Sequence, residues 1–251
     1  MTANNDGAAA QQGGRFVLVT GGKGGVGKST FSRGLLDVYL SQGITVAAYD
    51  GDPDNSQLFR FYQQQGAGVV PLALDVQGQA DRLLDEMEAA KAQVFLIDVA
   101  AGGSKTLRDL EDDIGLVSEA VEMGYGFTVV SVMSRVKDSV NLLRNTLEMT
   151  EGLPADHVAV KNLYFGDEDQ FELFDESKTK PRLTERGGVV VEMPKLFDDT
   201  YAAIDQANLP FRTALGVPTR MMPRAHKSRV RKWLRLFEAE LRGKAQGVLG
   251  L

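Results

Sequence analysis

The chain contains no cysteine among its 251 residues. This absence excludes disulfide bonds and every site built on thiolate ligands, iron–sulfur clusters among them. Also missing are an apolar run of about 18 residues, the minimum for a membrane-spanning helix, and an N-terminal signal-peptide pattern. These absences predict a cytoplasmic protein, and its 43% of hydrophobic residues is enough to build a full core.

Charge is unevenly distributed along the chain, whose net charge is −6. Between Thr219 and Lys244, nine basic and two acidic residues give +7, which leaves −13 for the remainder. A basic end on an acidic protein indicates an anionic partner for that end.

Strand-like and helical patterns alternate after a polar tail at residues 1–14, which we expect to be disordered. Predicted strands cover 15–20, 45–50, 93–98, 127–132, 157–163 and 189–191, with a weaker candidate at 69–74. Predicted helices cover 29–42, 56–65, 79–91, 104–122, 137–150, 168–177, 195–207 and 224–243. This alternation predicts a single α/β domain at residues 15–251, with three layers in which helices cover both faces of a mostly parallel sheet.

The most informative segment is GGKGGVGKST, at residues 21–30. It contains the phosphate-binding pattern G-x-x-x-x-G-K-[ST] between a predicted strand and a predicted helix. Glycines let backbone N–H groups turn towards a phosphate, and the helix N-terminus adds partial positive charge. Lys28 is expected on the β- and γ-phosphates and the Ser29 hydroxyl on Mg2+. The predicted nucleotide-binding residues are Gly22, Gly24, Gly25, Val26, Gly27, Lys28, Ser29 and Thr30.

A second lysine, Lys23, follows the first glycine of this pattern. Residues 23–29 therefore read K-G-G-V-G-K-S, which resembles the deviant Walker A box of the ParA/MinD family of ATPases, a phosphate-loop NTPase family. The resemblance implies an ATP-bound homodimer in which Lys23 reaches the nucleotide of the partner subunit and joins Lys28 in catalysis. It also implies slow hydrolysis that a partner protein stimulates.

Carboxylates follow two further predicted strands. Asp50, Asp52 and Pro53 match the D-x-D-P element of the family, and the resemblance gives Asp52 the attacking water and Asp50 a place near Mg2+. Asp98 ends the strand at 93–98 in the Walker B pattern, so we expect it to hold Mg2+ through water. The alternative for the first pair is an ordinary acidic turn.

The residues that would read the base are less clearly marked. The guanine-specific N-K-x-D pattern is absent, and the resemblance places Asn162 and Pro194 near an adenine. ATP is therefore expected from the resemblance, although Asn162 could equally cap the end of its strand. Only 45 residues separate Asp52 from Asp98, and there is no room for a helix-turn-helix domain before Arg15, which is similar to small, plasmid-type ParA-like proteins.

The basic C-terminal segment has a helical stripe at Val230, Leu234, Phe237 and Leu241, with Trp233 beside it. Three interpretations are open: the stripe packs and the cations are solvated; the stripe packs and the cations bind DNA phosphates without sequence preference; or the helix lies on an anionic membrane with Trp and Phe down. We favour DNA. The candidate DNA-binding residues are Arg224, Lys227, Arg229, Arg231, Lys232 and Arg235.

Together these features predict a Mg2+-dependent ATPase that dimerises with ATP and positions or segregates DNA cargo, most plausibly a plasmid. Such a protein would be associated with the nucleoid. One alternative is a MinD-type ATPase that acts at a membrane surface. Another is a small-molecule phosphotransferase or ligase on the same fold, which would have no need of Lys23.

Overall fold

The computed structural model describes residues 13–22, 24–52, 55–63, 68–74, 78–89, 91–101 and 103–251. Within them, seven strands form one sheet in the order β3-β2-β4-β1-β5-β6-β7, and each neighbouring pair is parallel. The strands are β1 (Arg15–Gly21), β2 (Val46–Gly51), β3 (Val70–Pro71), β4 (Val94–Val99), β5 (Gly126–Met133), β6 (Ala155–Asn162) and β7 (Val189–Met193). All their carboxyl ends therefore meet at one edge of the sheet, where ligands bind in folds of this class.

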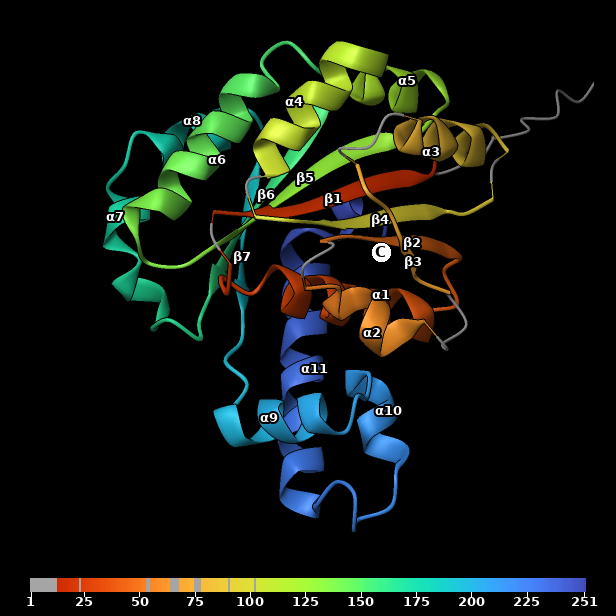
Figure 1. Ribbon diagram of the computed structural model, residues 1–251. Coiled ribbons are helices and arrows are strands. Elements are labelled where there is room, and N and C mark those ends of the chain that lie inside the picture. The colour runs from red at the N-terminus through yellow and green to blue at the C-terminus, as the bar shows by residue number, and fades with distance from the viewer. Residues whose placement is uncertain are drawn as a thin grey trace, which may run out of the picture.

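Helices cover both faces of the sheet (Figure 1). One face carries α3 (Gln79–Glu88), α4 (Gly103–Ile114), α5 (Leu116–Glu122) and α6 (Lys137–Met149), with the short α7 (Glu172–Asp175) and α8 (Thr179–Glu185) beside α6. The other face carries α1 (Lys28–Ser41), α2 (Gln57–Tyr62), the upper part of α11 (Arg224–Lys244) and α12 (Gln246–Leu249). The predicted three-layer α/β fold with a parallel sheet is confirmed.

Alternation along β1 shows why both faces need a cover. Phe16 and Leu18 join the core beneath α3, α4 and α5, whereas Val17 and Val19 join the core shared with α1 and α11. All four side chains are fully buried. A strand that is apolar on both sides is stable only between two helical layers, so the sequence of β1 dictates a central position in the sheet.

Three predicted helices differ from the structure. The helix expected at 104–122 is wrong, because Gly115 adopts a left-handed conformation with φ of 62° and separates α4 from α5. The stretch at 168–177 is a 3-10 turn at Glu168–Gln170 followed by α7. The helix expected at 195–207 begins three residues later, as α9 (Asp198–Gln206). Sequence patterns also missed α8, α10 (Phe211–Gly216) and α12, which are too short to show periodicity.

A helical projection extends from the covered sheet (Figure 1). We use this name for residues 198–233, which comprise α9, α10 and the first part of α11. The continuation of α11 packs against β7 and α1, so one helix belongs both to the projection and to the body. Within the described part of the chain, no helix combines the length and the apolar character needed to cross a bilayer. The predicted tail at 1–14 lies outside the described residues except for Gly13 and Gly14.

Candidate functional site: a cleft at the carboxyl edge of the sheet

The glycine-rich segment forms a tight loop between β1 and α1. Gly27 caps α1 in a left-handed conformation, with φ of 101°, and the helix begins at Lys28. A side chain rarely adopts this φ, so glycine here sets the direction in which the loop enters the helix. The first N–H groups of α1, which lack partners within the helix, therefore point out of the loop towards the carboxyl edge.

Asn162, the last residue of β6, holds this loop from the side. Its Nδ2 donates to the carbonyl oxygen of Val26 at 2.9 Å, and its Oδ1 accepts from the backbone N–H of Tyr164 at 3.0 Å. A Cβ atom on Gly27 would lie 2.4 Å from the same Nδ2. The amide of Asn162 thus supports the loop and caps the strand end; its expected contact with adenine stays a prediction.

The loop opens into a cleft of about 420 Å³, here named the loop cleft. Most of the predicted nucleotide-binding residues line it: Gly24, Gly25, Gly27, Lys28, Ser29, Thr30, Asp52, Asn162 and Pro194. Val26 turns its side chain into the core instead, and Gly22 lies against the backbone of Asp138. Lys23, Pro53 and Asp54 lie outside the described residues.

Two buried carboxylates stand behind the loop. Asp50 on β2 and Asp98 on β4 are direct partners in the parallel register, and each side chain is at most 2% exposed. Asp50 accepts from the backbone N–H groups of Asp52 at 3.1 Å and Phe59 at 2.8 Å. Neither oxygen of Asp98 has a hydrogen-bond partner among the described residues. An acceptor left unpaired in the core is costly unless a ligand satisfies it.

The pKa shifts of the two carboxyl groups also indicate a site for a cation. Burial raises the pKa of Asp98 to about 7, and the carboxylate of Asp50 acts in the same direction, against the opposing influence of Ser29 and Lys28. Burial likewise raises the pKa of Asp50. Two carboxylates in one buried site need a cation to be stable in their charged forms. The unpaired oxygens of Asp98 near the hydroxyl of Ser29 therefore fit Mg2+, which prefers oxygen ligands and bound water.

Asp52 lines the loop cleft from the turn after β2. Its Oδ1 accepts from the backbone N–H of Asn55 at 3.1 Å, and its carbonyl oxygen accepts from the Ser56 hydroxyl at 2.9 Å. The carboxylate is partly exposed to the loop cleft. It is thus a structured acidic turn and a cleft wall at once, and the two interpretations of this turn do not exclude each other.

Comparison with known proteins identifies the family. Residues 17–249 match the model of the CobQ/CobB/MinD/ParA nucleotide binding domain. The chain belongs to this family. It is similar to protein MobD of Acidithiobacillus ferrooxidans, with 26% identity over 223 residues that cover 87% of this chain and 92% of MobD.

Solved structures of family members share the fold. A ParA family ATPase from Chlorobium tepidum TLS aligns with a TM-score of 0.54 and 12% identity, over 89% of this chain and 98% of the other. MinD of Pyrococcus horikoshii OT3, complexed with Mg-ADP, aligns with a TM-score of 0.50 and 15% identity, over 90% and 95%. The predicted resemblance to the ParA/MinD family is confirmed, and with it the phosphate-loop NTPase fold.

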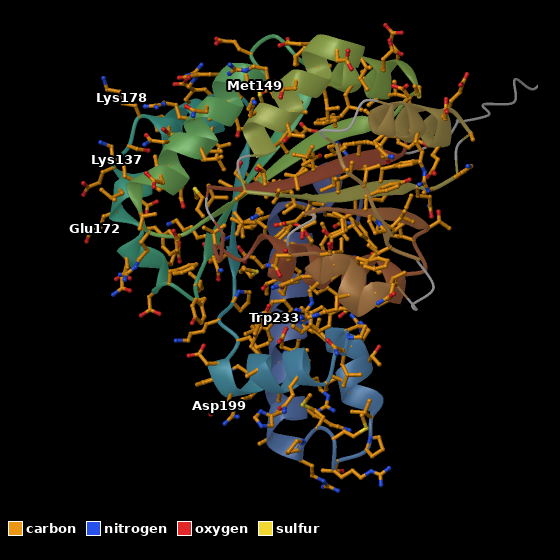
Figure 2. All side chains as sticks on the ribbon, in the orientation of Figure 1. Lys137, Met149, Glu172, Lys178, Asp199 and Trp233 are labelled. Atoms are coloured by element: carbon orange, nitrogen blue, oxygen red, sulfur yellow. The ribbon has the colours of Figure 1, made fainter. Side chains whose placement is uncertain are left out.

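Sequence reasoning missed the part of the loop cleft that the helical projection contributes. Tyr201 from α9 and Trp233 from α11 both line the cleft, more than 170 residues after the phosphate loop. The indole Nε1 of Trp233 donates to the carbonyl oxygen of Pro194 at 2.6 Å. Figure 2 shows Trp233 where the projection joins the body of this ParA/MinD-family domain. In the sequence, Trp233 lies beside the apolar stripe of its helix. That position predicts a core residue, and it gives no indication of a ligand site.

The basic helix α11 packs as predicted along its apolar stripe. Val230, Leu234, Phe237 and Leu241 are at most 4% exposed, and Trp233 is 2% exposed. The membrane interpretation with Trp and Phe facing lipid is therefore wrong, because both rings are inside the protein. Trp233 stacks on Phe237 with ring centroids 4.9 Å apart.

The candidate DNA-binding cations differ in their surroundings. Lys227 donates to the carbonyl oxygen of Val217, and the Arg229 guanidinium lies over the ring of Phe197 at 5.2 Å. The other four candidates are exposed and have no ion pair, side-chain hydrogen bond or ring contact within the described residues: Arg224, Arg231, Lys232 and Arg235. These four are free to meet an anionic partner.

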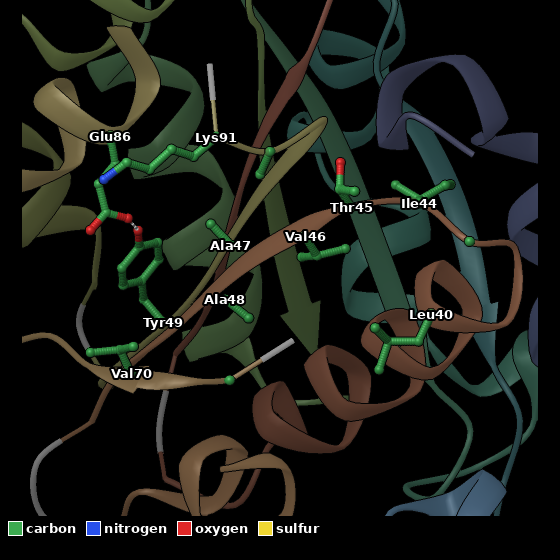
Figure 3. A pocket seen from close by; sticks show the side chains of 13 residues that line it. Leu40, Ile44, Thr45, Val46, Ala47, Ala48, Tyr49, Val70, Glu86 and Lys91 are labelled. Atoms are coloured by element: carbon green, nitrogen blue, oxygen red, sulfur yellow. Dashed lines mark hydrogen bonds between the residues drawn. The ribbon is translucent and has the colours of Figure 1, made fainter. Parts of the chain in front are cut away.

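A second hollow of about 430 Å³ lies beside β2, away from the loop (Figure 3). Its lining is mainly aliphatic, from Leu40, Ile44 and Val46, and the Tyr49 hydroxyl donates to Glu86 at its far side. Thr45 and Val46 belong to the amino end of β2, whereas ligands in this fold class bind at carboxyl ends. The polar groups suited to a phosphate are in the loop cleft.

Proposed function

We propose that this protein is a Mg2+-dependent, dimerising ATPase that uses ATP to position or segregate DNA cargo, such as a plasmid. One observation carries the proposal: α11 places Trp233 in the wall of the loop cleft and exposes Arg231, Lys232 and Arg235 on its outer side. A nucleotide site and a cationic surface therefore share one helix. Membership in a nucleotide-binding family supports the first half of the proposal.

In the proposed reaction a water molecule attacks the γ-phosphorus of ATP, and the bond to the bridging oxygen breaks to give ADP and phosphate. Lys28 and the N-terminus of α1 would hold the phosphate oxygens where negative charge develops. Asp52, which lines the same cleft, would orient the water and direct its lone pair. Mg2+, held by Ser29 and through water by Asp98, would offset the phosphate charge.

Dimerisation rests on the sequence of the loop. In the proposed dimer Lys23 would contact the nucleotide of the partner subunit, so ATP would join the two subunits and hydrolysis would release them. Each subunit would then add its own row of free cations to a doubled basic surface. Because counterion release grows with the number of phosphates contacted, doubling the surface strengthens DNA binding steeply.

Sedimentation with ATP, with and without duplex DNA, tests the switch. The wild type should form a dimer in ATP and a monomer in ADP, and Lys23→Ala should stay monomeric while still binding ATP. A wild type that is monomeric with ATP would rule out the switch and favour the phosphotransferase or ligase. A dimer that is retained by anionic lipid vesicles but not by DNA would favour the MinD-type alternative.

A charge-reversal pair tests the DNA surface. The double variant Arg231→Glu with Arg235→Glu should weaken binding to random-sequence duplex DNA and lower the salt dependence of that binding. Each phosphate contact that is lost reduces the number of counterions that the DNA releases on binding. Arg144→Glu with Lys178→Glu changes the same total charge at exposed positions on α6 and just before α8. If both pairs weaken DNA binding equally, only net charge matters and α11 is not the DNA surface.

A further inference from the structure

The hydroxyl of Tyr201 lies at a junction of three polar groups. It is 3.3 Å from the Thr30 hydroxyl, 3.3 Å from Nη1 of Arg33 and 3.4 Å from Oε1 of Gln57. A phenol can donate one hydrogen bond and accept two, so these partners use its full capacity. Thr30 belongs to the phosphate loop, Gln57 opens α2 after the Asp52 turn, and Tyr201 belongs to the helical projection.

The buried Arg33 makes the stability of this junction depend on the position of Tyr201. Its guanidinium is fully buried, 3.4 Å from the ring centre of Phe61 and 4.5 Å from that of Phe211. Its Nη2 reaches the carbonyl oxygen of Leu209 at 3.5 Å, just before α10. A buried cation loses much of its stabilisation when a partner moves away. A shift of Tyr201 would therefore leave the Arg33 guanidinium without one of its acceptors. This cost favours a few distinct positions of the helical projection over a gradual movement.

The same cluster leads to the basic helix. Phe211, which contacts Arg33, packs on Trp233 with ring centroids 4.8 Å apart, and Trp233 is bonded to Pro194 in the loop cleft. A contiguous set of packed groups thus runs from Thr30 through Tyr201 and Arg33 to α11. The set begins at Thr30 in the loop cleft and ends at Trp233, next to the exposed cations Arg231, Lys232 and Arg235 on the same helix.

We propose that Tyr201 is a positioning residue that couples the phosphate loop to the helical projection, so that nucleotide in the cleft sets the position of the cations on α11. This inference rests on the proposed function. Coupling between two binding sites is reciprocal, so DNA on α11 should raise the affinity of the cleft for nucleotide by the same factor by which nucleotide raises DNA affinity. Factors of about 5- to 150-fold are typical of such coupling.

The test measures the nucleotide dissociation constant of the full chain with and without a saturating random-sequence duplex. A non-hydrolysable ATP analogue is the ligand, and Trp233, the single tryptophan, reports binding by fluorescence. In the wild type the duplex should lower the dissociation constant at least about fivefold. In Tyr201→Phe the ring stays and the hydroxyl is lost, so the ratio should fall well below the wild-type ratio, towards the part that dimerisation alone contributes, whatever happens to the affinity itself.

Tyr125→Phe is the matched control. Its hydroxyl is buried and shares its one proton between the carbonyl oxygens of Met87 and Ala92, at 3.3 and 3.4 Å, on the opposite face of the sheet. This variant should keep the wild-type ratio. If Tyr201→Phe also keeps it, the inference is wrong while the proposed function stands. If the wild-type chain does not bind the duplex at all, the proposed function itself is wrong.

Thr30→Val provides the second variant, since it removes the other end of the same hydrogen bond and nearly preserves the side-chain volume. It should lower the ratio by the same factor as Tyr201→Phe, and adding Tyr201→Phe should have no further effect on the ratio. Independent, additive effects of the two substitutions would overturn the inference. Because Thr30→Val does not alter the projection, it remains informative if Tyr201→Phe fails to fold.

Discussion

The phosphate loop and the helical projection meet in one cleft, but they contribute to it by different kinds of contact. The loop offers backbone N–H groups from consecutive residues, whose geometry depends on the conformation of Gly27 and on support from Asn162. The projection offers side chains, Tyr201 and Trp233, whose positions depend on aromatic packing around Arg33 and α11. Substitutions should therefore damage the loop through backbone geometry and the projection through lost packing.

The largest effect is expected at Phe237, where the continuation of α11 anchors the projection to the body. This ring is fully buried on α11 and lies edge-on to Phe31 of α1 at 5.4 Å. Phe237→Ala should lower the free energy of unfolding by about 3–5 kcal/mol, through lost burial and the cavity left behind. Urea unfolding followed by circular dichroism measures the change.

Its neighbour Leu236 supplies the control, because its side chain is 42% exposed on the same helix. Leu236→Ala should change the unfolding free energy by no more than about 0.5 kcal/mol. Equal losses for the two variants would mean that α11 does not pack as described, and that packing is not what holds the projection to the body.

A smaller effect, confined to ligand binding, is expected on the loop side. Gly27→Ala forces a side chain into a left-handed conformation, at about 1–2 kcal/mol, and displaces the Asn162 amide, at about 0.5–1.5 kcal/mol. ATP affinity should therefore fall roughly 10- to 300-fold, given that 1.4 kcal/mol is tenfold. Isothermal titration calorimetry gives the change.

Gly24→Ala is the matched variant within the same loop. A Cβ atom at this position would meet nothing within 4 Å, and Gly24 does not have a positive φ. Its ATP affinity should stay much closer to that of the wild type. If the two variants lose the same affinity, backbone conformation at Gly27 is not the deciding feature, and the contrast between loop and projection is weakened.

The difference between the phosphate loop and the helical projection also explains which parts of the cleft the sequence could predict. The loop, Asp50 and Asp98 were found because phosphate and metal binding need particular residue types at short spacings after a strand. Register then placed Asp50 beside Asp98 across β2 and β4. The parallel sheet followed in the same way, from strands that are apolar on both faces.

Tyr201 and Trp233 could not be found in this way. Their approach to the loop depends on how α9 and α11 cross the end of the sheet, and that crossing is set by packing between residues more than 100 positions apart. Trp233 belongs to an apolar stripe, so its pattern predicts a core residue. The break at Gly115 was missed for a related reason, since α4 and α5 continue the same helical periodicity on both sides of it.

The smallest effect is expected at His157, which lies in the sheet, apart from both the phosphate loop and the helical projection. His157 on β6 is 1% exposed, with Nε2 at 2.9 Å from the Thr150 hydroxyl. Burial lowers the pKa of His157 from 6.5 to about 4, and the Arg186 guanidinium acts in the same direction. Between these values the unfolded chain binds more protons than the folded one, so stability falls as the pH falls. From pH 7 to pH 5 this residue should remove about 2 kcal/mol.

Unfolding free energies at pH 7 and pH 5 for the wild type and His157→Gln measure this contribution. The variant should lose less stability on acidification, and His226→Gln, at the other histidine, serves as the matched substitution on α11. Because His157 lies apart from both the loop cleft and the projection, His157→Gln should leave the nucleotide affinity at pH 7 unchanged. A His157→Gln variant with the full acid sensitivity of the wild type would place the titrating group elsewhere. Asp50 and Asp98 are not candidates, because burial raises the pKa of each, and a raised carboxyl pKa makes the folded state more stable as the pH falls.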